Sequence, residues 1–207
     1  ADVWLVGLNG KVTRFAESMA RPRAYAGFTS ANGHLIVIGG IARPDDMTTI
    51  QTLTSLDLDD PDKPWRTSDV DPSFGRIIPL VGAGLSKLVW GGGCSLSEKD
   101  GKPFRSYHEN LAYQSTNGEG NRFHGLPNKL AGAAGPGVLS QTHLFFVGGD
   151  DGTQYGQPYE THTGLARRIL VMDLETFEVT DLGEWPHPIA IVGGLMALTG
   201  VWWSRRS

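Results

Sequence analysis

Two short stretches of the chain place a histidine beside a carboxylate and a phenol. They are Tyr107-His108-Glu109 and Tyr159-Glu160-Thr161-His162. An imidazole exchanges protons near neutral pH, and a neighbouring carboxylate or phenol can orient it or share the proton. The pattern predicts general acid/base catalysis by His108, His162, Glu109 and Glu160. Simple polar binding of a hydroxylated ligand by the same groups is the alternative.

Other candidates for ligand binding lie in the same polar segments or, for Arg23 and Tyr25, in the link before the first repeat. Three of these segments, at about residues 41–52, 93–109 and 150–166, are long and are expected to be loops. Long ordered loops on a rigid scaffold commonly carry function, although most charged loop residues are only solvated. The candidates are Arg23, Tyr25, Arg43, Arg105, Tyr107, Asp150, Asp151, Tyr155 and Tyr159.

Each long segment follows a short apolar run that ends in glycines. The runs are residues 35–40, 88–92 and 144–149, and we take their first glycines to be Gly39, Gly91 and Gly148. These are 91 − 39 = 52 and 148 − 91 = 57 residues apart. A period of about 50 residues is typical of a repeat architecture.

Each repeat is interpreted as four strands. In the first unit they are a small-residue strand at 26–29, the apolar strand ending in glycines, an alternating strand at 53–59 and a short strand at 65–69. This order resembles a blade of a kelch-type β-propeller. That family has a diglycine after its second strand, an aromatic or apolar residue in its third, and a tryptophan opening its fourth. Leu56 stands where the family usually has tyrosine, and Trp65 matches the tryptophan.

The resemblance implies a single all-β domain over residues 1–207 with four blades of antiparallel strands. Three blades are expected at about 20–72, 73–127 and 128–186. The fourth combines 187–207 with 1–16, so that the N-terminal strands of 2–16 complete the last blade with 189–203 and close the ring. A fragment of a larger ring and a ring shared by two chains are the alternatives.

The blade interpretation sorts the loops onto two rims. The long loops share one rim with the links between blades, whereas the short turns lie on the other. We therefore predict a small-molecule site at the channel mouth on the long-loop rim. The function would be that of an isomerase or cyclase, like the family's sugar mutarotases and epimerases, acting on a sugar or a cyclic metabolite. A kelch-type protein-interaction module without catalysis, and a purely structural propeller, are the alternatives.

The composition of the chain limits the kinds of binding partner that we expect. The formal net charge is −4, which disfavours nucleic acid, and no apolar run approaches the 18 residues of a membrane span. The single cysteine, Cys94, excludes an intrachain disulfide framework and is interpreted as a small core or loop residue. We expect a monomer or a homodimer.

No cofactor or metal site is expected. The chain lacks dinucleotide-binding, phosphate-loop and serine-hydrolase motifs and a zinc-type cluster of histidines and cysteines. A cation held in the channel by carbonyls or by Asp150 would leave no signature. The absence of a glycosylation sequon and of a signal-like start favours the cytoplasm. Secretion is the alternative, because a signal could precede residue 1.

Overall fold

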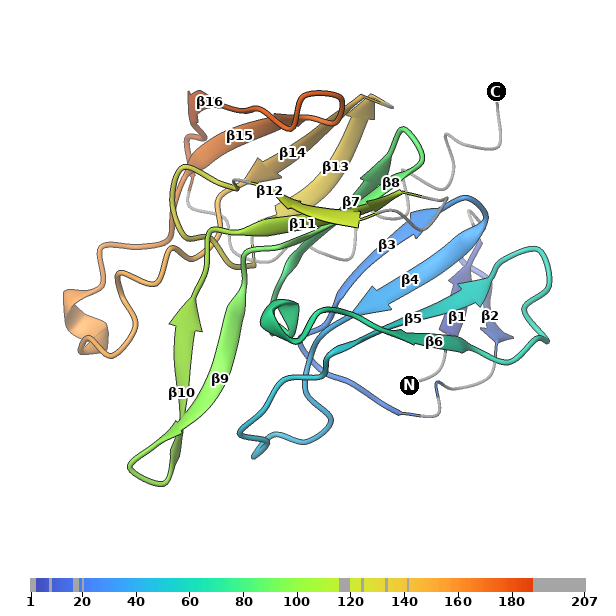
Figure 1. The fold of residues 1–207 in the computed structure, drawn as a ribbon, viewed down its shortest axis with the longest axis horizontal. Coiled ribbons are helices and arrows are strands. Elements are labelled where there is room, and N and C mark those ends of the chain that lie inside the picture. Colours follow the sequence, from blue (N-terminus) through green and yellow to red (C-terminus); the bar gives the residue numbers. More distant parts are fainter. Residues whose placement is uncertain are drawn as a thin grey trace.

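The structure is a computed structural model that describes residues 3–7, 9–16, 19, 21–115, 120–123, 125–132, 134–140 and 142–187. The described residues form three four-stranded antiparallel sheets and two two-stranded hairpins (Figure 1). The helical residues among them belong to two short 3-10 turns, η1 (Pro72–Phe74) and η2 (Tyr159–Thr161). The all-β expectation is therefore confirmed for this part of the chain.

Each sheet is an antiparallel meander in which the successive strands of that sheet pair side by side. The first sheet contains β3 (Gly27–Ala31), β4 (His34–Ile38), β5 (Thr52–Asp57) and β6 (Arg66–Asp69). The second contains β7 (Leu80–Gly84), β8 (Lys87–Gly91), β11 (Leu111–Ser115) and β12 (Gly120–Phe123). The third contains β13 (Ala134–Ser140), β14 (His143–Val147), β15 (Arg168–Asp173) and β16 (Val179–Glu184). These are the four strands predicted for each of the first three units.

One predicted loop is itself a hairpin. Within 93–109, β9 (Cys94–Lys99) pairs with β10 (Lys102–Tyr107) across an Asp100-Gly101 turn. Both turn residues have positive φ, 52° and 72°, as a tight two-residue hairpin turn requires. The expectation of an irregular loop here was wrong. The segment is polar and was interpreted as a loop, although it contains the Asp-Gly pair that is typical of a hairpin turn. The hairpin projects from the second sheet in Figure 1.

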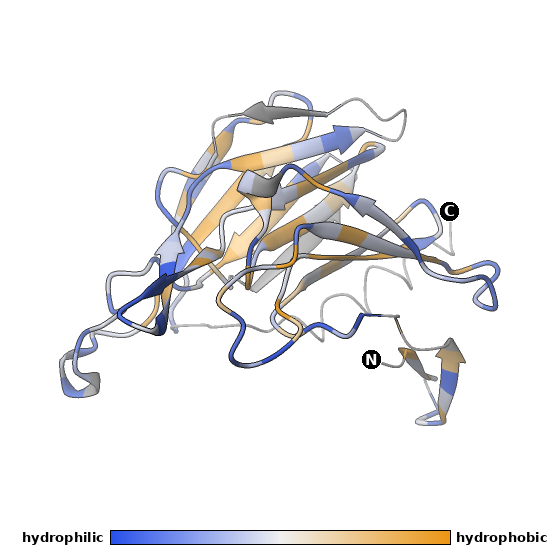
Figure 2. Cartoon of the chain, turned by 60° about the horizontal axis from the view of Figure 1, so that its bottom comes forward, coloured by the Kyte–Doolittle hydropathy of each residue, from blue (hydrophilic) through white to orange (hydrophobic). Residues whose placement is uncertain are grey.

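The N-terminal hairpin forms as predicted. β1 (Val3–Val6) pairs with β2 (Val12–Ala16), and Figure 2 shows it apart from the three sheets. Its predicted partner strands at 189–203 lie outside the described residues. Among the described residues the sheets do not close into a ring, so the four-blade closure stays a prediction.

The first strands of the three sheets lie next to one another, with β7 between β3 and β13. The second sheet consequently buries both faces. Val89 and Leu111 pack towards Phe146 and Met172 of the third sheet, and Trp90 packs towards Ile38 of the first. This explains why the run at 88–90 is continuously apolar instead of alternating. Figure 2 shows the hydrophobic residues gathered where the sheets face each other.

The glycine pairs repeat at equivalent places, one step away from the predicted register. The amides of Gly39, Gly92 and Gly148 each donate to a carbonyl at the start of the third strand of their own sheet. Those acceptors are the carbonyls of Thr52, Asn110 and Arg168. The second diglycine is therefore Gly92-Gly93, and not the pair beginning at Gly91. Three consecutive glycines at 91–93 made the register ambiguous in the sequence.

In the first two pairs, the second glycine ties its sheet to the next. Gly40 donates to the Arg76 carbonyl at 2.7 Å, and Gly93 donates to the Leu130 carbonyl at 2.8 Å. Figure 1 shows segment 41–50, the β9–β10 hairpin and the loop containing η2 extending to the same side. The β3–β4 and β7–β8 turns lie on the opposite side. We call the first side the long-loop rim.

Candidate functional site

The long-loop rim is built on a repeated backbone frame. Isolated bridges pair Ala24 with Ile41, Ile77 with Cys94 and Ala131 with Asp150. Next to these bridges, the Ile78 amide donates to the Tyr25 carbonyl at 2.6 Å, and the Gly132 amide donates to the Ile78 carbonyl at 3.0 Å. Each sheet thus presents equivalent positions at the rim, and a side chain that departs from the repeat stands out.

Four of the predicted residues come together between the second and third sheets. Tyr107 Oη donates to Asp150 Oδ2 at 2.6 Å. The Arg105 amide donates to Tyr155 Oη at 3.2 Å, and the Arg105 guanidinium lies 5.9 Å from the centre of the Tyr155 ring. The Tyr107 and Tyr155 ring centres are 6.0 Å apart. We call Arg105, Tyr107, Asp150 and Tyr155 the rim cluster.

Burial differs within the rim cluster and sets the protonation state of Tyr107. Tyr107 is 8% exposed, and burial, with its hydrogen bond to Asp150, raises the pKa of its phenol. Tyr107 therefore stays protonated and donates at neutral pH. Tyr155 is 37% exposed. The cluster accordingly offers one fixed donor–acceptor pair, one guanidinium and one open aromatic ring, a set suited to holding a polar ligand.

Cys94 lies beneath the rim cluster. Its side chain is fully buried, in a small apolar cluster with Ile41, Ile77 and Ala131. Burial raises the pKa of the thiol to about 12, with smaller effects from Arg105, Asp150, Tyr107 and Arg76. The thiol is consequently neutral and inert near pH 7. This agrees with the interpretation of Cys94 as a core residue.

His108 lies in a half-buried, positively charged setting. Its Nε2 is 2.9 Å from Ser95 Oγ. Burial lowers its pKa to about 4, and the charges of Arg76 and Lys129 add to the shift. The imidazole is therefore neutral near pH 7, where it can donate one hydrogen bond or act as a weak base but cannot serve as a general acid.

The second predicted histidine is held by its own loop. His162 Nε2 lies 3.1 Å from the Gln157 carbonyl, and both His162 and Glu160 are exposed in the segment around η2. Glu109 is also exposed. The side chain of Tyr159 lies outside what the structure describes.

The remaining predicted residues have backbone roles. Arg23 donates to the carbonyls of Gly39 and Thr52 and to the hydroxyls of Thr52 and Thr54. Asp151 accepts from the amide and hydroxyl of Thr153. The exposed Arg43 donates its amide to Asp46. These contacts shape the loops.

Tyr25 is the exception among these residues. It is 57% exposed on the rim and has a φ of 56°, a value unfavourable for a bulky side chain.

Arg76 was not predicted as a site residue from the sequence. It occupies the position equivalent to Arg23, directly before a bridge residue, and is only 3% exposed. Burial lowers its pKa to about 10. Aligning the repeats on their glycines would have placed the two arginines together.

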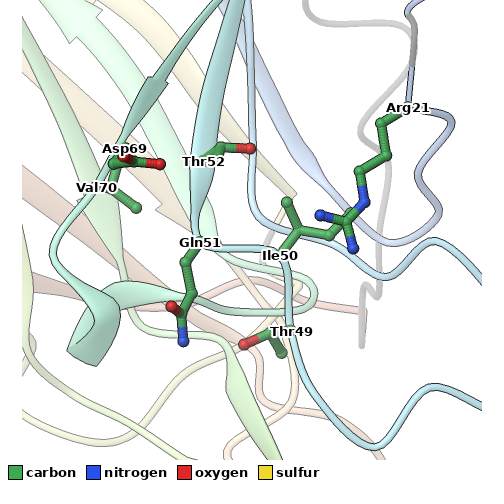
Figure 3. A pocket seen from close by; sticks show the side chains of 7 residues that line it. All are labelled: Arg21, Thr49, Ile50, Gln51, Thr52, Asp69 and Val70. Atoms are coloured by element: carbon green, nitrogen blue, oxygen red, sulfur yellow. The ribbon is translucent and has the colours of Figure 1, made fainter.

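An open pocket of about 440 Å³ lies at the outer part of the same rim, on the first sheet. Figure 3 shows Arg21 and Asp69 at opposite ends of it, with Ile50 and Thr52 between them. Its walls also include Thr49, Gln51 and Val70. None of the predicted residues lines this pocket, because no local motif marks it.

Three aspartates that lie within strands or at their ends have structural roles. Asp57 accepts from the Asp59 amide, Asp173 from those of Glu175 and Thr176, and Asp181 from that of Gly183. These backbone hydrogen bonds lower the pKa of each carboxyl. In the part of the chain that the structure describes, no three histidine, cysteine or acidic residues are grouped to hold a metal ion. Nor does any helix of that part have the length and apolar character needed to cross a membrane.

Comparisons with known proteins identify the fold and nothing finer. No protein-family model and no curated protein matches the chain. Among solved structures, the one titled "Structure of YjhT" is similar, with a TM-score of 0.65 and 17% sequence identity. The match covers 84% of this chain and 50% of that chain. This chain therefore spans about half the length of YjhT, and the likeness concerns the backbone arrangement of the sheets.

Proposed function

We propose that this chain is a kelch-type β-propeller of four blades that binds a small molecule at the long-loop rim. Three observations support the propeller: the three equivalent sheets, the adjacent first strands, and the glycine pairs that tie each sheet to the next. The N-terminal hairpin supports the fourth blade. Trp4, Val6 and Val12 are more than half exposed, and exposed apolar side chains of this kind indicate a surface that another element covers.

The rim cluster is the observation that carries the binding function. The β9–β10 hairpin and the loop after β14 bring Arg105, Tyr107, Asp150 and Tyr155 into contact, although Arg105 and Tyr155 are 50 residues apart. Convergent polar groups beside an open aromatic ring suit a hydroxylated ligand such as a sugar or a cyclic metabolite. Acid/base isomerisation or cyclisation is the reaction class that such groups serve without a redox cofactor.

The neutral state of His108 refines this chemistry. A histidine with a pKa of about 4 is unprotonated at neutral pH. It would accept a proton from the ligand or donate a hydrogen bond to it, whereas a different group would supply the acid. His162 and Glu160 lie in a separate part of the rim, so the proposal places the first contacts with the ligand at the rim cluster.

A thermal-shift screen with sugars and small cyclic metabolites tests the binding function. A ligand at a hundred times its dissociation constant adds about 2.7 kcal/mol, which raises the melting temperature of a domain this size by about 5–10 °C. Tyr155→Ala is expected to abolish the shift. Leu182→Ala, which truncates an exposed side chain on β16, should retain it. An unchanged shift in Tyr155→Ala would exclude the rim cluster as the site.

A protein-interaction module is the second candidate function. The open rings of Tyr25 and Tyr155 on the rim favour it, because exposed aromatic residues are enriched at protein interfaces. In that case no small molecule stabilises the chain, and a partner protein is captured through Tyr25 and Tyr155.

The ring closure has its own test. Light scattering should give the mass of one 22.4 kDa chain, and deletion of residues 1–16 should expose the last blade and destabilise the whole domain. Twice the mass would favour a ring formed by two chains. A truncated chain as stable as the full one would refute closure by the N-terminal strands.

A further inference from the structure

The repeated frame of the rim shows where the second sheet departs from its neighbours. In each sheet, one backbone amide donates to the carbonyl of the second glycine of the pair. The residue that supplies this amide is Ile50 in the first sheet, His108 in the second and Ala166 in the third. Ile50 is 2% exposed. The repeat therefore favours an apolar residue here, and the second sheet has an imidazole instead.

The equivalent arginines differ in the same region. Arg23 makes four hydrogen bonds to acceptors from residues 39, 52 and 54. In the second sheet, Asn110 and Ala112 replace Thr52 and Thr54 at the equivalent strand positions. Arg76 retains a bond of 3.0 Å to the Gly75 carbonyl and one of 3.4 Å to Asn110 Oδ1. Its Nε, like that of Arg23, is buried and has no partner in the structure, so the difference lies in the terminal nitrogens.

The surroundings of His108 are positive. Arg76 and Lys129 both act electrostatically on His108, and no carboxylate contributes to the shifts of either His108 or Arg76. Lys129 is exposed, and its neighbour Leu130 donates its amide to the His108 carbonyl. A buried guanidinium is ordinarily paired with an anion because desolvation of an unpaired charge is costly. Here the acceptors are two neutral oxygens.

We propose that Arg76, His108, Asn110 and Lys129 form a binding site for a small oxyanion, the carboxylate or phosphate group of a ligand. Guanidinium and ammonium groups bind such oxyanions by charge-assisted hydrogen bonds. The site requires the tautomer in which Ser95 Oγ donates to His108 Nε2 and the hydrogen on Nδ1 is donated to the ligand. The exposed Lys129 attracts the anion to the rim, and Arg76 supplies the buried charge.

The oxyanion site rests on the proposed function, because it specifies which class of small molecule binds at the same rim. The two groups adjoin each other, because His108 directly follows Tyr107 of the rim cluster in the chain. Cys94 pairs with Tyr107, and its neighbour Ser95 lies 2.9 Å from His108. A ligand with a hydroxylated ring and one acidic group could contact both.

Titration of the whole chain with inorganic phosphate, and separately with acetate, tests the site. The protein is labelled with nitrogen-15 in its six histidines, and the ring signals are followed at pH 7 and low ionic strength, where exposed charges are least screened. His108→Gln assigns the signal. The His108 signal should move saturably with at least one of the two anions but not with chloride at matched ionic strength. Tighter binding of phosphate indicates a phosphorylated ligand, and tighter binding of acetate a carboxylic acid.

Two lysine variants provide the matched comparison. Lys129→Gln should weaken the binding about tenfold, the effect of losing one such contact. Lys102→Gln, at the exposed first residue of β10, should leave it unchanged. Arg76→Gln should abolish saturation if it folds, and Asn110→Ala serves if it does not. A shift that never saturates, or equal effects of the two lysine variants, overturns the oxyanion site.

The outcome is separable from that of the sugar screen. Saturable phosphate or acetate binding that depends on Lys129 supports the oxyanion site even if no sugar raises the melting temperature. A neutral sugar that stabilises the wild type and Lys129→Gln equally, with no anion binding, supports the proposed function and overturns the oxyanion site.

Discussion

Tyr107 Oη donates a 2.6 Å hydrogen bond to Asp150 Oδ2, across a separation of 43 residues. Tyr107 ends β10 opposite Cys94, and Asp150 follows the second glycine of the third sheet. Asp150 Oδ1 also accepts from the Gly152 amide at 2.9 Å. One carboxylate thus joins the hairpin of the second sheet to the loop of the third.

Tyr107→Phe should destabilise the chain by about 1–3 kcal/mol, because it removes a charge-assisted hydrogen bond from a half-buried carboxylate. Urea unfolding measures the change. Tyr155→Phe is the matched control, since it removes a longer bond of 3.2 Å from an exposed hydroxyl and should cost under about 1 kcal/mol. Equal costs for the two variants would refute the special role of Tyr107.

Gly39→Ala should destabilise the chain by roughly 3 kcal/mol or more, a loss measurable by thermal unfolding. Gly39 has a φ of 69°, and a Cβ there would lie 2.3 Å from the Arg76 carbonyl oxygen. Gly101→Ala separates the two causes, because Gly101 has a φ of 72° and no atom within 4 Å of the added Cβ. It should cost only about 1–2 kcal/mol, the cost of the backbone conformation.

His108→Gln should flatten the dependence of stability on pH between about 6.5 and about 4. The pKa of His108 is lowered in the folded chain to about 4, so between these values the unfolded chain binds a proton that the folded chain does not. Stability therefore falls as the pH falls through this window and is fully present above about 6.5. Urea midpoints at several pH values provide the measurement. An identical slope in the variant would show that His108 titrates normally.

Ser86→Gly should stabilise the chain by about 0.5–1 kcal/mol, in contrast to the usual cost of adding a glycine. The β7–β8 turn places Leu85 at φ 47° and Ser86 at φ 56°, a geometry that favours asparagine and glycine. Leu85 packs against the core between the second and third sheets, which explains its presence. Ser115→Gly, within β11, should instead destabilise by about 0.5–1 kcal/mol. Urea midpoints that shift in the same direction for both variants would contradict this account.

Local patterns were enough to predict most of the sheet architecture. The strand order of the first three units, the N-terminal hairpin and the common rim of the long segments depend on apolar runs, glycines and turn residues that act within a few residues of each other. The β9–β10 hairpin was missed because its strands are polar and lack the alternation of a half-buried strand. The diglycine register at 91–93 was missed because only contacts with Leu130 and Asn110 identify which two glycines repeat.

By itself, then, the sequence determined an all-β repeat whose long segments share one rim, because strand and turn formation is governed by neighbouring residues. Which rim residues meet was decided only by the tertiary structure. It joined Tyr107 to Asp150, kept His162 within its own loop, and left Arg76 buried against neutral acceptors. The physical reason is that hydrogen bonding, burial and the resulting pKa shifts depend on distances between segments far apart in the chain, and the spacing of residues along the chain does not specify those distances.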